Sequence, residues 1–496
     1  MKACKIFFGL TAIALSATTV SHATEFRSAS VRALGMGGSN VATTNGVDAS
    51  YWNPAAYGFF GADDSSSEMK AVDNSGLSNK DFGLGIDAGA GVSLFGPIAD
   101  NVNILQNMQI PTGNANAGLS PSEIVAAANF TKDFSSLDPA LGGLNVSVDA
   151  TIGARVLNYG IGVHQFVDIN AGVAFDNQNT GLGGNAAFIN AFTNGGATII
   201  PGMGAFASPG GYFTVAQQDS LRTQLVNTGY TADQAAAIVG GYDAALQAGG
   251  VPASDSAVMS DALITLATAP GDFQNNGTSI ETRGVSVREI GFTYGYAINE
   301  SLSIGTVIKQ LSAEMIIASA DAFGSTNTLS NTQDATGSET ASGLGLDLGL
   351  MYRIPNWQFG LTARNVNAPS FEHSSGYVYE MKPQVKLGAA WVPSSEFSVE
   401  LGYDATENEG AVSGSKSKYW NFGLEWDAWK VLALRAGAYK NMAQDDIGTV
   451  ASVGLGLNLW AMRLDMAYAQ SNKKVAFEGD EIPVYAMASV ALAIDF

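Results

Sequence analysis

Residues 419–429, YWNFGLEWDAW, contain the pattern that decides the fold. Every second position is large and apolar, whereas the positions between them carry polar, acidic or glycine residues. The apolar set is Trp420, Phe422, Leu424 and Trp426. Successive side chains of a β-strand point to opposite faces, so this alternation predicts a strand with one apolar and one polar face.

The same alternation recurs along the chain, for example in WQFGLTAR at 357–364 and FSVELGYD at 397–404. It predicts about 14 strands, and bacterial outer-membrane barrels have an even number of strands. The expected strands cover 82–95, 144–156, 158–174, 284–298, 301–317, 343–354, 356–366, 379–392, 396–405, 418–428, 430–440, 449–460, 462–470 and 483–496.

A large secreted β-protein would also alternate, but three further features favour a membrane barrel. Aromatic residues such as Trp357 and Trp391 lie at strand ends, as in the interfacial girdles of barrels. The polar faces combine glycine with charge, as expected of a lumen. Tight joins such as Pro355-Asn356 alternate with longer ones, and the longest are 96–143 and 175–283. We therefore expect an all-β fold, an antiparallel transmembrane β-barrel over 82–496 with its short turns in the periplasm.

The start of the chain predicts export. Lys2 and Lys5 precede an apolar stretch that is too short to span a membrane, and Ser21-His22-Ala23 suits signal peptidase, so 1–23 is expected to be a signal peptide. The one cysteine, Cys4, lies within it. Charged residues make up only 14% of the chain, against about 25% in soluble domains. The net charge of −21 disfavours nucleic acid as a partner.

The two longest loops contain helix signals. Ser120 with Glu123, Thr214 with Gln217 and Thr231 with Gln234 have the spacing of capping boxes, and Ser254 is expected to cap a further helix. These helices predict an extracellular cap, which could act as a lid that captures a ligand or as a shield for the barrel rim.

The segment before the first strand is unusual, because ASYWNPAAYGFF at 49–60 is apolar, irregular and poor in helix signals. A barrel of this width needs side chains, water or a plug in its interior. Gly35, Gly37 and Gly38 permit close packing, and Asn53-Pro54-Ala55 predicts a fixed turn. We expect 24–60 to fold into the lumen as a hatch.

The stretch RSASVRALGMGGSNVATTNGVDASYWNPAA, residues 27–56, resembles the N-terminal hatch of the FadL-like superfamily, the long-chain fatty-acid transporters of the outer membrane. The shared motifs are LGMGG and NPA. The resemblance implies a hatch that blocks a barrel of about 14 strands and moves to release hydrophobic cargo. Segment 96–143, GLNVSVDATIGARVLNYGIGV and KPQVKLGAAW are most similar to the TraF-like branch, which is associated with conjugative transfer. The terminal Phe496 resembles the signal read by the barrel-assembly machinery.

Other candidate sites are weaker. GMGG lacks the strand–helix context of a nucleotide loop, and His164 and His373 alone cannot form a His-rich zinc site or a convincing hydrolase. The acidic stretch 73–81 and the TENEG and QDDIG loops are more typical of solvated surface than of calcium sites. We expect lumen charges of both signs to bind the hatch to the wall: Asp87, Asp149, Arg155, Lys309, Asp347, Arg364, Lys386, Glu400, Arg435 and Asp465.

The sequence therefore predicts a hatch-plugged protein of the Gram-negative outer membrane, with no enzymatic activity, cofactor or metal. Its expected function is passive, gated passage of small hydrophobic compounds. The alternative is a scaffold for conjugative transfer or surface assembly without transport. The expected partners are outer-membrane lipids and lipopolysaccharide, the barrel-assembly machinery and a hydrophobic small molecule.

Overall fold

The computed structural model describes residues 30–59, 82–108, 111–138, 142–193, 211–322, 338–374, 378–409, 416–429, 431–445, 447–459, 462–477 and 480–495. The predicted signal peptide, the stretch 73–81 and Phe496 lie outside these described residues.

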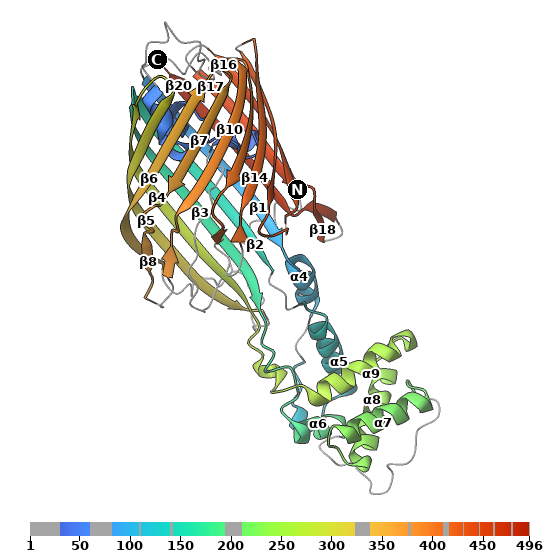
Figure 1. Cartoon of the computed structure of the whole chain (residues 1–496). Coiled ribbons are helices and arrows are strands. Elements are labelled where there is room, and N and C mark those ends of the chain that lie inside the picture. The colour runs from blue at the N-terminus through green and yellow to red at the C-terminus, as the bar shows by residue number, and fades with distance from the viewer. Residues whose placement is uncertain are drawn as a thin grey trace.

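Fourteen of the described strands close into one antiparallel barrel (Figure 1). Strand β1 pairs with β20 from Gly83↔Asp495 to Ser93↔Tyr485, so the described wall has no free edge. The predicted 14-stranded antiparallel barrel is confirmed. Around the wall the strands are β1 Phe82–Phe95, β2 Gly143–Val156, β3 Tyr159–Ala174, β4 Ser279–Ala297, β5 Leu302–Asp321, β6 Ser338–Ile354, β7 Trp357–Arg364, β10 Gln384–Ser394, β11 Phe397–Asp404, β14 Tyr419–Ala428, β15 Leu432–Asn441, β16 Thr449–Leu459, β17 Met462–Ser471 and β20 Tyr485–Asp495.

One predicted strand was wrong at its start. The strand expected over 379–392 begins only at Gln384, because Val378–Glu380 forms β9, which pairs with β8, Ser370–Glu372, in a separate hairpin. Pro383 stands immediately before β10, and proline cannot donate to the ladder of a sheet. Two further short hairpins lie outside the wall: β12 Asn408–Glu409 with β13 Lys416–Ser417, and β18 Lys474–Phe477 with β19 Asp480–Pro483.

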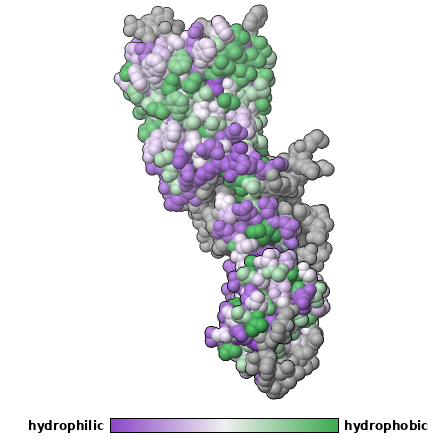
Figure 2. All heavy atoms as spheres, turned by 90° about the vertical axis from the view of Figure 1, so that its right-hand side faces the viewer, coloured by the Kyte–Doolittle hydropathy of each residue, from purple (hydrophilic) through white to green (hydrophobic). Residues whose placement is uncertain are grey.

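The outer face of the barrel is apolar. Exposed side chains such as Ile152, Phe292 and Leu401 form its middle. Aromatic residues stand near both ends of the strands: Tyr352, Trp357, Trp391 and Trp426 at the short turns, and Tyr403, Trp420 and Tyr468 at the opposite ends. Figure 2 shows hydrophobic residues gathered on the barrel and hydrophilic residues where the barrel meets the helices. A closed barrel with an apolar band between aromatic girdles is the structure of an integral outer-membrane protein of a Gram-negative bacterium.

Among the described helices, none is both long and apolar enough to cross a membrane. We call the end of the barrel with the short turns the periplasmic end and the other the extracellular end, as in other outer-membrane barrels.

The two longest loops fold together into one helical cap beyond the extracellular end (Figure 1). A shared core includes Phe130, Phe188, Leu225, Tyr242 and Leu263. The cap helices are α5 Pro121–Ser135, α6 Asn185–Phe192, α7 Val215–Asn227, α8 Ala232–Ala248 and α9 Ser256–Thr268, and α4 Ile98–Asn107 follows β1 toward them.

The three predicted capping boxes, at the starts of α5, α7 and α8, are all formed. The expected cap at Ser254 is wrong, because the residue that precedes α9 is Asp255 and Ser254 lies in a short 3-10 turn. The Ser254 hydroxyl instead donates to the Asp255 carboxylate, 3.0 Å away.

Candidate functional site

The N-terminal segment occupies the barrel lumen near the periplasmic end (Figure 1). We call its described part, residues 30–59, the hatch. It comprises α2 Val31–Gly35, η1 Gly46–Asp48, α3 Ala49–Trp52 and η2 Pro54–Phe59. Ser30 caps α2 by accepting from the Ala33 N–H. Trp52 is 0% exposed and Tyr57 is 1% exposed, so these large rings fill the interior rather than face solvent.

The glycines of the LGMGG motif lie against β15 and β16. Gly37 and Gly38 have φ of 63° and 78°, a left-handed conformation that glycine adopts at little cost. A Cβ on Gly37 would lie 2.5 Å from the Ala438 nitrogen. A Cβ on Gly35 would lie 3.0 Å from the Cα of Gly454. The motif therefore allows hatch backbone to touch wall backbone.

The Asn53-Pro54-Ala55 motif joins two parts of the hatch to the wall. The Asn53 side-chain amide donates to the Val41 carbonyl at 3.0 Å and to the Leu350 carbonyl of β6 at 3.1 Å. Its side-chain oxygen accepts from the Ala55 N–H at 3.1 Å. The Ala55 carbonyl in turn accepts from the Ser303 hydroxyl of β5 at 2.6 Å. Asn53 is fully buried and extended, with φ −161° and ψ 100°, as its place before proline favours.

The polar faces of the strands are glycine-rich because side chains there would collide with the hatch. At eight wall glycines an added Cβ would lie within 2.2 to 2.4 Å of a hatch atom. Gly85 of β1 and Gly160 of β3 meet side-chain carbons of Val47 and Tyr57, and the other six meet hatch backbone or the Asn53 side chain. These six occupy successive neighbouring strands on each side of the lumen, and we call them the glycine belt: Gly295 of β4, Gly305 of β5, Gly349 of β6, Gly360 of β7, Gly423 of β14 and Gly437 of β15. The belt is a seat shaped to the hatch backbone.

Glu400 of β11 holds the middle of the hatch. One carboxylate oxygen accepts from the N–H groups of Val41 and Ala42 at 2.7 and 2.9 Å. The other accepts from the N–H and the hydroxyl of Thr43 at 3.1 and 2.5 Å. Glu400 is 0% exposed, so these four donors replace the hydrogen bonds that water would make to its carboxylate at the surface.

A buried ion-pair network holds the first hatch helix. The Arg32 guanidinium lies 2.5 Å from one carboxylate oxygen of Glu425 on β14. Arg435 of β15 donates to the other oxygen at 2.9 Å and to Asp465 of β17 at 2.6 Å. Arg463 completes the group beside Asp465, at 2.7 Å. The hatch thus supplies one of three arginines around shared carboxylates.

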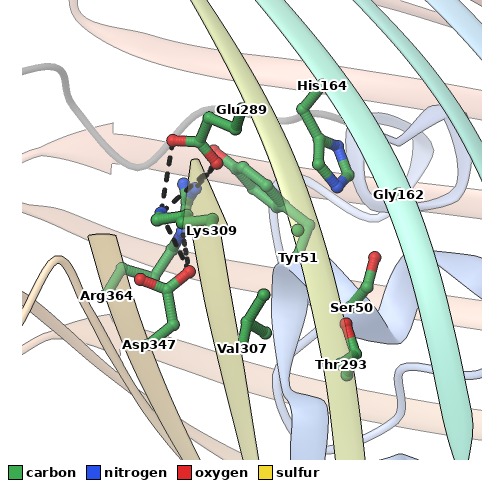
Figure 3. A pocket seen from close by; sticks show the side chains of 11 residues that line it. Ser50, Tyr51, Gly162, His164, Glu289, Thr293, Val307, Lys309, Asp347 and Arg364 are labelled. Atoms are coloured by element: carbon green, nitrogen blue, oxygen red, sulfur yellow. Dashed lines mark hydrogen bonds and ion pairs between the residues drawn. The ribbon is translucent and has the colours of Figure 1, made fainter. Parts of the chain in front are cut away.

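A second charged network faces α3 of the hatch (Figure 3). Lys309 lies 2.9 Å from Asp347 and 3.2 Å from Glu289, and Arg364 lies 2.6 Å from Glu289. The Arg364 guanidinium sits 3.8 Å from the centre of the Tyr51 ring, a cation–π contact between wall and hatch.

The cavity between these side chains is about 10 Å³, which is room for one water molecule and too small for a substrate. His164 lines its opposite side, 3.0 Å from the Thr151 hydroxyl (Figure 3). His164 is therefore a buried polar residue of the lumen wall.

The charges expected in the lumen are all buried there: Asp87, Asp149, Arg155, Lys309, Asp347, Arg364, Lys386, Glu400, Arg435 and Asp465. Asp87 accepts from the Val31 N–H at 2.7 Å. Arg32, Glu289 and Glu425 were not among the expected residues. Glu289 and Glu425 alternate with apolar residues on their strands, which was the available signal, whereas nothing around Arg32 marks it as a lumen residue.

Two apolar patches lie in the lumen on the extracellular side of the hatch, beside the polar faces of β2 and β3. On one wall Tyr439, Val450 and Met487 pack with Val31 and Leu34 of the hatch. On the other wall the β8–β9 hairpin turns inward, and its Phe371 and Tyr379 bury the lumen faces of β4 and β5 at Val287, Leu311 and Met315.

The ladders of the wall are regular. Strand β3 pairs without a shift with β2, from Gly143↔Gly172 to Val156↔Tyr159, and with β4, from Tyr159↔Tyr294 to Ala174↔Ser279. Among the described pairs, the one register shift lies between Trp391 and Ser394 of β10, at the periplasmic end. The described wall therefore shows no gap between neighbouring strands.

Several solved structures are similar to this chain. The Pseudomonas putida toluene transporter TodX is 12% identical with a TM-score of 0.41, over 94% of this chain and 98% of that one. The CymD monoaromatic hydrocarbon channel is 11% identical with a TM-score of 0.44, over 96% and 99%. A Pseudomonas aeruginosa FadL homologue is 8% identical with a TM-score of 0.40, over 97% and 100%.

No curated protein sequence matches the chain. A family model does: the family described as "F plasmid transfer operon, TraF, protein" matches residues 103–404, from the start of the cap to the end of β11. The resemblance to the TraF-like family is thereby confirmed. Because the match covers more than half of the 496 residues, the chain belongs to this TraF family.

Proposed function

We propose that the protein is a gated outer-membrane channel for small hydrophobic molecules, and that the hatch is its gate. In this proposal Gly35, Gly37 and Gly38 seat the hatch, and Asn53, Pro54 and Ala55 anchor it. The observation that carries the proposal is the polar character of the seat, in which buried charges and backbone hydrogen bonds hold the hatch to the wall.

Polar contacts suit a detachable gate. A buried ion pair contributes little net stability, because its attraction is offset by the cost of removing both charges from water. When the hatch moves and water enters, Glu425, Arg435 and Glu400 regain hydration. If the same contact were apolar, opening would cost about 25 cal/mol of free energy for each Å² of apolar surface exposed to water. The charged part of the seat therefore adds less to the stability of the closed state than an apolar seat of the same area would, although Trp52 and Tyr57 also bury apolar surface there.

The chemistry of the upper lumen supports hydrophobic cargo. Two patches there present aromatic and aliphatic side chains: one around Tyr439 and Met487, the other around Phe371 and Tyr379. Toluene, the compound in the description of one similar structure, is a suitable first probe.

A disulfide that locks the hatch to the wall tests the proposal. Ala42 of the hatch and Ala390 of β10 are fully buried and pack in the same cluster. Each already carries a Cβ, so cysteines at both positions can bridge hatch and wall without a new collision of a Cβ with backbone. The predicted mature chain has no other cysteine, because Cys4 is in the predicted signal peptide.

In cells that express Ala42→Cys/Ala390→Cys, uptake of radiolabelled toluene should fall to the vector background when the pair is oxidised and recover after reduction. Each single cysteine variant should take up toluene at its own constant rate in both conditions. Uptake that continues through the oxidised, folded double variant would rule out the hatch as the gate.

A scaffold for conjugative transfer is the second candidate, and two observations favour it. The family description names a plasmid transfer operon, and the cap has a hydrophobic core of its own beyond the barrel. Replacing 111–138 and 177–276 with short Gly/Ser connections removes most of the cap and leaves β2, β3 and β4 intact. If the protein is a scaffold, this deletion should abolish conjugative transfer and leave toluene uptake unchanged. If it is a channel without a scaffold role, the frequency of transfer should not change.

A further inference from the structure

A second, larger cavity lies in the cap. Its volume is about 400 Å³, within the usual range for small-molecule sites. It opens between the C-terminal ends of α5 and α9 and the segment that follows β3, so it sits where the cap joins the barrel. Its chemistry is set by two phenyl rings and five polar side chains: Phe134, Phe175, Thr131, Ser135, Thr265, Asn177 and Thr180.

Two phenyl rings form a fixed apolar wall. Phe134 and Phe175 meet edge to face, with ring centres 6.4 Å apart and planes at 82°. Phe134 also stacks at 5.7 Å on Phe130, which is 1% exposed and belongs to the cap core. The rings are thus held in place before a ligand arrives, and aromatic rings favour the faces and edges of other aromatic rings.

Asn177 and Thr180 are the lining side chains that can donate to a ligand, whereas the other three polar side chains have their protons engaged. The hydroxyl of Thr131 donates to the Ala127 carbonyl at 3.0 Å, that of Ser135 to the Lys132 carbonyl at 2.8 Å, and that of Thr265 to the Asp261 carbonyl at 2.9 Å. A hydroxyl has one proton and two lone pairs, so each of these oxygens can only accept from a ligand. The C-terminal ends of α5 and α9 add partial negative charge on the same side.

We propose that this cavity binds a small aromatic molecule that carries a hydrogen-bond donor, such as a phenol. The ring packs on Phe134 and Phe175, and the donor reaches the acceptor oxygens of Thr131, Ser135 and Thr265. A carboxylate, which only accepts, is disfavoured by these three oxygens and by the helix C-termini, although Asn177 and Thr180 could donate to it. The site is separate from the lumen and does not depend on whether the barrel conducts.

Three fluorinated probes of similar size test the donor requirement on the full chain in detergent, by ¹⁹F NMR titration. 4-Fluorophenol has the donor, 4-fluoroanisole replaces it with a methyl ether, and 4-fluorobenzoate is anionic. We expect 4-fluorophenol to bind about tenfold more tightly than 4-fluoroanisole, the effect of one hydrogen bond of about 1.4 kcal/mol, and 4-fluorobenzoate not to bind. Equal binding of the phenol and the ether would overturn the proposal.

Two variants place the site. Thr265→Trp fills the cavity from an exposed helix position and should abolish binding, whereas Thr265→Val keeps the shape and should reduce only the preference for the phenol. The matched control is Thr223→Trp on α7, whose hydroxyl makes the same type of bond to the Asp219 carbonyl, at 2.8 Å, outside the cavity. Unchanged 4-fluorophenol binding in both Thr265 variants would also overturn the proposal.

Discussion

Gly37 and Gly46 have the same left-handed backbone, with φ of 63° and 61°, but very different surroundings. A Cβ on Gly37 would meet wall backbone at 2.5 Å, whereas a Cβ on Gly46 has nothing within 4 Å. Alanine at either position costs about 1–2 kcal/mol of backbone strain, and only Gly37→Ala adds a collision with β15. In planar bilayers we expect Gly37→Ala to show frequent open events and Gly46→Ala to remain as closed as the wild type.

The two variants separate the effect of contact between hatch and wall from the effect of backbone strain. If both variants stayed closed while folded, contact between hatch and wall backbone would not govern closure. If both opened equally, the left-handed turn itself rather than the glycine belt would be responsible.

Glu400 offers a second residue-scale prediction. Glu400→Gln keeps the size of the side chain but turns an NH₂ group toward the hatch N–H groups, so about half of the four contacts are lost. Hydrogen bonds to a charged group contribute about 1.5–3 kcal/mol each, so the hatch should be released far more often. We expect raised conductance and faster protease cleavage of the hatch in purified protein.

The matched control is Glu407→Gln at the extracellular rim. Glu407 is 46% exposed and pairs with Lys416 at 2.7 Å, a contact of the kind that adds little stability. The conductance of the Glu407→Gln barrel should equal that of the wild type. A Glu400→Gln barrel as closed as this control would show that the clamp is dispensable.

At the scale of elements, Asp176 ties the departure of the chain from β3 to its return into β4. Its carboxylate accepts from the N–H groups of Gln178 and Gly277 at 2.9 Å and from the Asn179 amide at 2.8 Å. Partial burial alone would raise the pKa of Asp176, but these hydrogen bonds outweigh it and hold the pKa below its ordinary value.

A lowered pKa means that the folded junction favours the ionised form. Its stabilisation is present above the ordinary pKa of about 4 and is lost as pH falls through the lower folded value. Hydrogen exchange of peptides covering 175–183 and 270–278, corrected for the intrinsic effect of pH, should therefore accelerate below about pH 4 in the wild type. Asp176→Asn should exchange fast at every pH; the same pH profile in both proteins would contradict this role.

Strands and helix starts were largely predictable because their signals are local. Period-two alternation located the wall strands, and three capping boxes located the starts of α5, α7 and α8. Helix α6 was missed because Gly184 precedes it and makes no side-chain cap. Strand β9 of the inward hairpin was merged into β10, because its alternation runs on almost to Pro383, and β8 was missed.

The residue types of the candidate site were predictable from the sequence, but the contacts between them were not. Glycine and charge on the polar faces indicated a lumen that contacts a hatch. No local pattern could show that Glu400 meets Val41 to Thr43, or that Gly349 makes room for Asn53, because those contacts join residues about 300 or more positions apart. The union of 96–143 and 175–283 into one cap is non-local in the same way.

For the whole molecule, the closed wall predicts heat-modifiable migration in denaturing gels and a fixed topology. On intact cells, protease should cleave within 215–268 of the cap and should spare the turn at Pro355-Asn356, which lies at the opposite end of the barrel. Permeabilised cells provide the control, since both sites are then in contact with the protease. Cleavage at Pro355-Asn356 on intact cells would invert the proposed orientation.

The seam between β1 and β20 gives the hatch a role in biogenesis. The hatch precedes β1, yet its seat is built from strands all around the wall, and the ring is sealed by residues about 400 positions apart in sequence. A ring that seals before the hatch is seated is a hole in the permeability barrier. Cells therefore have a toxic interval to avoid at each insertion event. Strains that carry hatch-loosening variants should become sensitive to bulky antibiotics that the outer membrane normally excludes.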